Sequence, residues 1–210
     1  MEEIDRKLKE YIEQSIFPIY EKNDVGHRIE HIYYVINRSL KLMNQFDNIN
    51  PNMVYTIASF HDVAHHIDRL QHEKLSANLF YEDEKMKEFF TDEERKIIKE
   101  AIIDHRASLE YEPRSNYGKI ISSADKNVDV QTALKRTHAY TIKNYPKISL
   151  EEILNRGYNH LTEKFGEDGY AKNYCTDEEY EKYLKELQDL LKSKDKFTEK
   201  YIEVNNISIK

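Results

Sequence analysis

Residues that break regular structure are rare in this chain, which has five glycines and four prolines among its 210 residues. A β-sheet protein needs many tight turns and usually contains more of both. Apolar residues instead recur at intervals of three and four, as in Ile4, Leu8, Tyr11 and Ile12, which is typical of amphipathic helices. We therefore expect an all-α fold, a single-domain helical bundle with additional C-terminal helices.

The same periodicity predicts where the helices lie. The segment 52–66 is the most apolar and is expected at the centre of the bundle. A capping box at Thr91 to Glu94 marks one helix start, and Thr176 to Glu179 is expected to cap the last helix. A loop is expected over 106–116. The expected helices cover 2–16, about 32–43, 52–66, 72–82, a segment from the Thr91 cap through Ile102, 117–130, 131–143, 149–165 and a last segment to about Glu203.

Composition narrows the classes of partner and compartment. The formal net charge of -7 disfavours nonspecific binding to duplex nucleic acid. No apolar run approaches the roughly 20 residues needed to cross a bilayer, and Met1 to Asp5 lacks the basic and apolar parts of a signal peptide. Cys175 is the single cysteine and cannot form an internal disulfide, which favours a reducing compartment. We expect a cytoplasmic protein with neither a membrane nor duplex nucleic acid as partner.

The dipeptide His61-Asp62 carries the strongest chemical signal, because it closes the apolar segment from Val54 to Phe60. A buried imidazole beside a buried carboxylate needs partners for both groups. A divalent metal ion satisfies both, since imidazole nitrogen and carboxylate oxygen are good ligands for such ions. His31 upstream and Asp125 downstream, on separate expected helices, are two further candidate ligands.

In order and spacing, these residues resemble the HD-domain metal-dependent phosphohydrolases. The resemblance rests on His31-Ile32 near a helix start, His61-Asp62 at the end of an apolar helix, and Asp125 within Ser122 to Lys126. It covers roughly residues 24–130 and implies an all-helical fold of the HD-domain type. It also implies a metal ion held by His31, His61, Asp62 and Asp125, and hydrolysis of a phosphate ester, often in a nucleotide.

The domain organisation that follows has three parts. Residues 1–23 are expected to form an N-terminal helix, residues 24–130 an HD-type metal-binding core, and residues 131–210 a C-terminal helical extension packed on the core. Some members of the family hold a second metal, and His72 and His105 resemble the histidines that would bind it. The sequence is compatible with one bound ion or with two. Mn, Co, Ni, Fe, Mg and Zn are all candidate metals.

The resemblance also implies a mechanism, in which a metal-activated water attacks phosphorus and Asp62 or a neighbouring group takes its proton. His65, one turn after His61, is expected to act as a proton relay or phosphate contact, or else to cap a helix end. The family often has an arginine where this chain has Tyr34, and an acidic residue where it has His65. The expected cations and substrate contacts are Arg106, Arg114, Lys126 and His66. The expected partner is a small phosphorylated substrate, and the oligomeric state is open, with a homodimer as one alternative.

Two other functions fit parts of the sequence. His27, Glu30 and His31 match the H-x-x-E-H motif of inverted zinc proteases, although that reading leaves His61-Asp62 and Asp125 without a role. A non-catalytic module that binds a metal or nucleotide would use the same ligands without turnover. Redox chemistry at a dinuclear iron centre is a further alternative.

Overall fold

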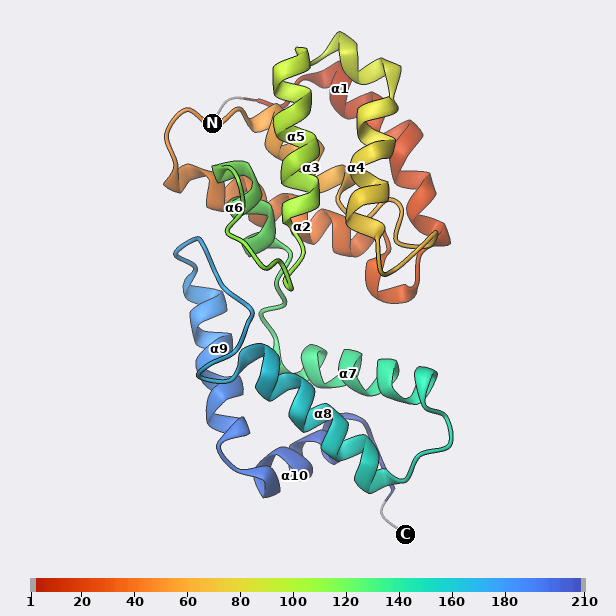
Figure 1. The fold of residues 1–210 in the computed structure, drawn as a ribbon, viewed down its shortest axis with the longest axis vertical. Coiled ribbons are helices and arrows are strands. Elements are labelled where there is room, and N and C mark those ends of the chain that lie inside the picture. The colour runs from red at the N-terminus through yellow and green to blue at the C-terminus, as the bar shows by residue number, and fades with distance from the viewer. Residues whose placement is uncertain (1–2, 209–210) are drawn as a thin grey trace. The chain divides into compact units, whose positions relative to one another are not determined.

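The computed structural model describes residues 3–208 and confirms the all-α fold class, with no strand among these residues (Figure 1). The α-helices are α1 (Arg6–Tyr11), α2 (Ile29–Leu42), α3 (Pro51–Phe60), α4 (His72–Glu82), α5 (Asp92–Asp104), α6 (Asn116–Ala124), α7 (Val130–Asn144), α8 (Leu150–Phe165), α9 (Glu178–Leu191) and α10 (Lys194–Val204). A π-helical turn, Ile12–Ile16, continues α1. The 3-10 turns are Phe17–Lys22, Val25–His27, Met43–Gln45 and Glu84–Glu88.

The helices are distributed over two compact units. The first comprises the chain up to Asp125 together with residues 173–176, and the second comprises residues 126–172 and the chain from Asp177 onward. Each unit has its own cluster of buried apolar side chains. The additional C-terminal helices expected from the sequence thus form a core of their own. The expected three-part division at residues 23 and 130, and the packing of the extension on the core, stay predictions.

Helix α3 lies in the core of the first unit, as its apolar sequence predicts. All its residues from Met53 to Phe60 are buried, and it packs against α2, α5 and α6. Asn50 caps its start by accepting a hydrogen bond from the Asn52 backbone N–H, and Pro51 occupies the first helical position. Helices α4 and α5 run beside each other in the same unit (Figure 1). The central helix therefore brings its C-terminal end, His61, into the middle of this unit.

Helix α3 ends at Phe60, so the expectation of a helix to residue 66 is wrong at its end. Residues 61–67 instead form successive turns closed by bonds such as His65 N to Asp62 O at 3.0 Å. The side chain of Asn23 stabilises these turns, since its Nδ2 donates to the Asp62 carbonyl at 3.0 Å and its Oδ1 accepts from the His66 N–H at 2.9 Å. The Asp62 carbonyl and the His66 N–H therefore have hydrogen-bond partners although they are outside a helix.

Three other expected boundaries differ. Helix α6 covers 116–124 rather than 117–130, because Asp125 ends it and residues 127–129 are irregular. The last expected helix is two helices, α9 and α10, because Ser193 takes extended backbone angles and its side chain accepts from the Lys196 N–H. The N-terminal helix begins at Arg6, since Asp5 caps it and residues 3–5 are not helical, and it changes to a π-turn at Ile12; its expected start at residue 2 lies outside the described residues.

The second unit packs around tyrosine and phenylalanine rings. Its fully buried aromatic residues are Tyr180, Tyr183, Phe197 and Tyr201. Helix α8 approaches this cluster closely at Gly157, where a Cβ atom would lie 3.0 Å from the Tyr201 ring. Among the residues that the structure describes, no helix combines the length and hydrophobicity that crossing a bilayer requires.

Candidate metal centre

The four proposed ligands of the first ion come together in the first unit, at the ends of three helices. His31 lies in the first turn of α2, His61 and Asp62 follow α3, and Asp125 is the C-cap of α6. The Nε2 atom of His31 lies 3.0 Å from Asp125 Oδ1 and 3.8 Å from Asp62 Oδ2. The Nε2 atom of His61 lies 3.5 Å from Asp62 Oδ2 and 3.7 Å from Asp125 Oδ1. All four side chains therefore face one point.

The donor atoms at this point do not satisfy one another by hydrogen bonds, but their spacing suits the coordination of a divalent ion. His31 Nε2, His61 Nε2 and Asp62 Oδ1 are buried and, within the described chain, have no hydrogen-bond partner in good geometry. Each buried polar atom left in this state costs about 1–3 kcal/mol. Ligand atoms about 2.0–2.2 Å from a shared ion lie about 3–4 Å from one another. The separations of 3.0 to 3.8 Å between imidazole and carboxylate match that requirement.

A second group of donors meets on the other oxygen of Asp62. His72, the first residue of α4, places Nε2 3.2 Å from Asp62 Oδ1, and His105, the C-cap of α5, places Nε2 3.5 Å from it. The two imidazole Nε2 atoms lie 3.1 Å apart. Ligand atoms of Asp62, His72 and His105, like those of His31, His61 and Asp62, all fall within 4.8 Å of one another. Asp62 is thus positioned between two groups that could each hold an ion.

The electrostatics of the cluster keep its carboxylates ionised. Burial would raise the pKa of the Asp62 carboxyl, but the His61 and His105 imidazoles hold it well below its usual range. Burial acts on Asp125 in the same sense, and the neighbouring His31 and His61 imidazoles hold its pKa well below the usual range. For His61, burial favours the neutral ring, but the two aspartates raise its pKa to about 9. A divalent ion would take the place of that ring proton.

His65 and His66 are next to the centre but have different surroundings. His65 is buried and lies 5.2 Å from His72 between ring centroids. Burial and the neighbouring His27 lower its pKa to about 4, so its ring is neutral at physiological pH. His66 is partly buried, and its Nδ1 lies 3.1 Å from Asn23 Oδ1. The catalytic role expected for His65 and the substrate contact expected for His66 stay predictions.

The expected cations are engaged in contacts that stabilise the fold. Arg106 donates to the Leu70 carbonyl at 2.6 Å and to Glu73 at 3.0 Å. Arg114 binds the fully buried Asp104 carboxylate through Nη2 at 2.6 Å and through its backbone N–H at 2.7 Å. These bonds fasten the loop between α5 and α6. The roles expected of both arginines toward substrate stay predictions.

Lys126 belongs to the second unit, where its Nζ lies 5.8 Å from the centroid of the Tyr180 ring. It is buried, unlike most lysines. The catalytic role expected for it also stays a prediction.

The geometry of the first unit disfavours the zinc-protease alternative. His27 belongs to the 3-10 turn before α2, and Arg28 between that turn and α2 is extended. The two histidines of the H-x-x-E-H motif are therefore not on one helix. Glu30, which would be the general base, is exposed.

Two residues that position the site were not identified from the sequence. Asn23 holds the turns after α3 through Asp62 and His66, and Asp24 binds His27. Asparagine and aspartate before a helix are ordinary turn residues, so nothing local distinguished them. The partners of Asn23 lie about 40 residues further along the chain. The partner of Asp24 is His27, which belongs to the H-x-x-E-H motif.

Comparison with known proteins agrees with the geometry. Residues 28–127 match the family model described as the HD domain, and this segment contains all six candidate ligands of the two groups. HD domains bind divalent metals, and the family consists in general of metal-dependent hydrolases. No curated protein and no solved structure matched the chain.

Proposed function

Because residues 28–127 match the HD-domain family model, we propose that this chain is a metal-dependent phosphohydrolase with two divalent ions at its centre. The observation that carries the proposal is the position of Asp62. Its Oδ2 faces His31 and His61, and its Oδ1 faces His72 and His105. A carboxylate with an imidazole pair on each oxygen would contribute a ligand to each of two ions.

In this proposal, each ion has its own ligand set. His31, His61, Asp62 and Asp125 would hold the first ion, and Asp62, His72 and His105 the second. A bound divalent pair supplies Lewis acidity toward phosphoryl oxygens and makes water a stronger nucleophile at neutral pH.

The chain's own residues orient the donors and accept the proton. Hydrogen bonds from Nδ1 to backbone carbonyls fix the rings of His61, His72 and His105, so that each Nε2 faces Asp62 or Asp125. Asp125 has 27% of its side chain exposed, whereas Asp62 has 4%. Asp125 is therefore the carboxylate of the centre that solvent reaches, and we propose it as the group that would take up a proton there.

We propose a small phosphorylated compound as substrate, with nucleotides as the first class to examine. The superfamily supports this choice, because its HD domains are associated with phosphohydrolase activity. The metal ions would supply the positive charge that phosphate requires, since Arg106 and Arg114 are already bound to Glu73 and Asp104.

Those two ion pairs also favour a second candidate function. A site whose neighbouring arginines are held by carboxylates has fewer groups to stabilise a transition state. A non-catalytic module that binds metal and a small phosphorylated ligand would have the same six ligands and no turnover. Turnover therefore distinguishes the two candidates.

The test measures metal content and hydrolysis in the same preparations. Protein loaded with Mn²⁺, Co²⁺ or Fe²⁺ is assayed against nucleoside mono-, di- and triphosphates, cyclic dinucleotides and p-nitrophenyl phosphate. We expect Asp125→Asn and His31→Gln to lower hydrolysis at least about 100-fold, because loss of a direct ligand exceeds the effect of an outer contact. Asp47→Asn, which changes an exposed aspartate of the same unit, is the matched control.

Three results would decide between the candidates. Turnover that depends on Asp125, with two ions in the centre, supports the hydrolase. Metal binding that depends on Asp125 without turnover of any phosphoester supports the binding module. Metal content unchanged in Asp125→Asn and His31→Gln would refute the centre itself.

A further inference from the structure

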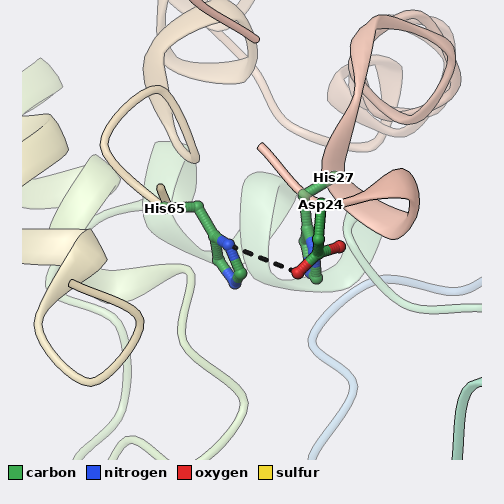
Figure 2. A group of neighbouring side chains, drawn as sticks. All are labelled: Asp24, His27 and His65. Atoms are coloured by element: carbon green, nitrogen blue, oxygen red, sulfur yellow. Dashed lines mark hydrogen bonds and ion pairs between the residues drawn. The ribbon is translucent and has the colours of Figure 1, made fainter. Parts of the chain in front are cut away.

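A third group of metal-binding side chains lies outside the six ligands of the proposed centre. It consists of Asp24, His27 and His65, and we call it the outer triad. Asp24 caps the 3-10 turn Val25–His27, and His65 lies in the turns that follow α3. Figure 2 shows the His65 ring facing the Asp24 carboxylate, with His27 beside it. Two segments about 40 residues apart therefore meet here.

The distances within the outer triad suit an ion. Asp24 Oδ1 lies 2.8 Å from His27 Nδ1 and accepts from the Gly26 N–H at 2.9 Å. Asp24 Oδ2 lies 3.8 Å from His65 Nδ1, which is too long for a hydrogen bond. Ligand atoms about 2.0–2.2 Å from one ion are separated by about 3–4 Å. One donor atom from each of the three residues lies within 4.8 Å of the others.

The chemistry of the donors defines the class of ion. Two imidazoles and one carboxylate suit Fe²⁺, Co²⁺, Ni²⁺, Zn²⁺ or Mn²⁺ and leave open positions for further ligands. The rings of His27 and His65 are nearly parallel, with centroids 3.9 Å apart and an angle of 18° between planes. On binding, His27 Nδ1 would exchange its contact with Asp24 Oδ1 for the ion. Asp24 is exposed, so an ion can enter from solvent.

The outer triad adjoins both ligand groups of the centre. The His27 ring lies 5.7 Å from the His31 ring, and the His65 ring lies 5.2 Å from the His72 ring. We propose that Asp24, His27 and His65 bind a third divalent transition-metal ion beside the proposed centre. None of these three residues is a proposed ligand of the other two ions, so loss of the third ion and loss of the proposed centre can be told apart.

The experiment counts cobalt ions in the whole chain. Metal-free protein is titrated with Co²⁺, and bound metal is measured by calorimetry and by elemental analysis after desalting. The total rests on the two ions of the proposed function: we expect three equivalents in the wild type and one fewer in Asp24→Asn and in His65→Gln. Asp24→Asn keeps an oxygen that can cap the turn through Gly26, so this variant should retain the fold. Asp47→Asn and His160→Gln, which change exposed residues of the same types, should keep three equivalents.

A second measurement needs no variant. Crystals soaked in Co²⁺ should give an anomalous scattering peak between Asp24 Oδ2 and His65 Nδ1, in addition to the peaks at the centre. Peaks at the centre alone, or equal cobalt content in Asp24→Asn and the wild type, would overturn the third site and leave the proposed hydrolase intact. Loss of the ions bound at Asp62 in Asp62→Asn, with the Asp24 peak retained, would support the separate site whatever the result of the hydrolase assay.

Discussion

At the scale of the single residue, three histidines of the centre share the same contact with their own backbone. His61, His72 and His105 each direct Nδ1 to the backbone carbonyl three residues earlier, at Ala58, Arg69 and Ile102, over distances of 2.6 to 2.9 Å. A carbonyl can only accept, so a neutral ring carries its proton on Nδ1 and its lone pair on Nε2. Each ring is thus prepared for a ligand by its own main chain, before any ion binds.

His138 in the second unit gives a pH-dependent prediction at the same scale. Its Nδ1 is buried without a hydrogen-bond partner among the described residues, its ring packs edge-on against Tyr201, and burial lowers its pKa below 6.5. The unfolded chain therefore binds a proton more readily, and the fold loses stability as pH falls below about 6.5. We expect the free energy of unfolding in urea to decrease less between pH 7.5 and pH 5.5 in His138→Phe than in the wild type.

The exposed His160 serves as the control for that measurement. His160→Gln should keep the acid sensitivity of the wild type. An identical decrease in His138→Phe and in the wild type would show that the His138 ring does not contribute to it.

At the scale of the helix, starts were predictable because they depend on neighbouring residues. The capping box at Thr91 is present, with the Glu94 N–H donating to Thr91 Oγ1 at 3.3 Å and Glu94 Oε2 accepting from the Thr91 N–H at 2.9 Å. The cap of α9 differs by one residue, since Asp177 rather than Thr176 accepts the backbone N–H groups. Caps are local signals, so sequence patterns predict them to within about a turn.

Helix ends depended on distant parts of the chain and were less predictable. The turns after α3 are stabilised by Asn23, and the Ala64 N–H donates to Ser76 Oγ at 3.1 Å. Neither partner is near in sequence, so an apolar periodicity through residue 66 pointed to a helix. The break before α10 comes from Ser193 within a run of charged residues, where the periodicity carries little information.

The residues of the candidate site divide in the same way into those that a sequence pattern identifies and those that only distant contacts identify. His31, His61-Asp62 and Asp125 could be selected because their order and spacing match a known motif. Asn23 could not, because its contacts with Asp62 and His66 exist only in the fold, and Asp24 could not, because an aspartate that caps a turn is common in sequences of all kinds. The contacts of Arg106 with Glu73 and of Arg114 with Asp104 were also not predictable, since a solvent-exposed loop arginine and a bound one look alike in sequence.

Packing of α8 against α10 gives a prediction about a single methyl group. Alanine in place of a helical glycine usually stabilises by about 1 kcal/mol. At Gly157 the added Cβ would lie 3.0 and 3.3 Å from ring atoms of Tyr201, which is fully buried and has little room to move. We expect Gly157→Ala to destabilise the protein by about 1 kcal/mol or more in urea unfolding, because overpacking outweighs helix propensity.

The exposed face of α8 provides the comparison. Asn159→Ala, two residues away and exposed, should raise stability by a few tenths of a kcal/mol. A similar increase in stability in Gly157→Ala would mean that the Tyr201 ring can move to accommodate the methyl group without loss of packing energy.

At the scale of the whole molecule, all proposed metal ligands belong to one of the two units. The six ligands of the centre and the three residues of the outer triad lie between Asp24 and Asp125. They come from the ends of α2, α3, α4, α5 and α6 and from the turns between them. An ion at the centre would therefore join helices of the first unit that already contact one another through apolar packing and through hydrogen bonds such as Arg38 Nε to the Ala124 carbonyl at 3.2 Å.

That distribution predicts where metal binding stabilises the chain. An ion that binds only the folded state adds about 4 kcal/mol at a free concentration 1,000 times its dissociation constant. Because the ligands tie together α2, α3 and α6, we expect Zn²⁺ or Mn²⁺ to slow amide hydrogen exchange in these helices and in residues 61–67. Exchange in α8 and α9, which contain no proposed ligand, should stay within about twofold of the metal-free rate. Mass spectrometry of peptides from metal-free and loaded protein measures both regions in one sample. Asp125→Asn should abolish the effect at the centre. Equal protection of both units would contradict the assignment of the ions to these six ligands. Protection that persists in Asp125→Asn would contradict it as well.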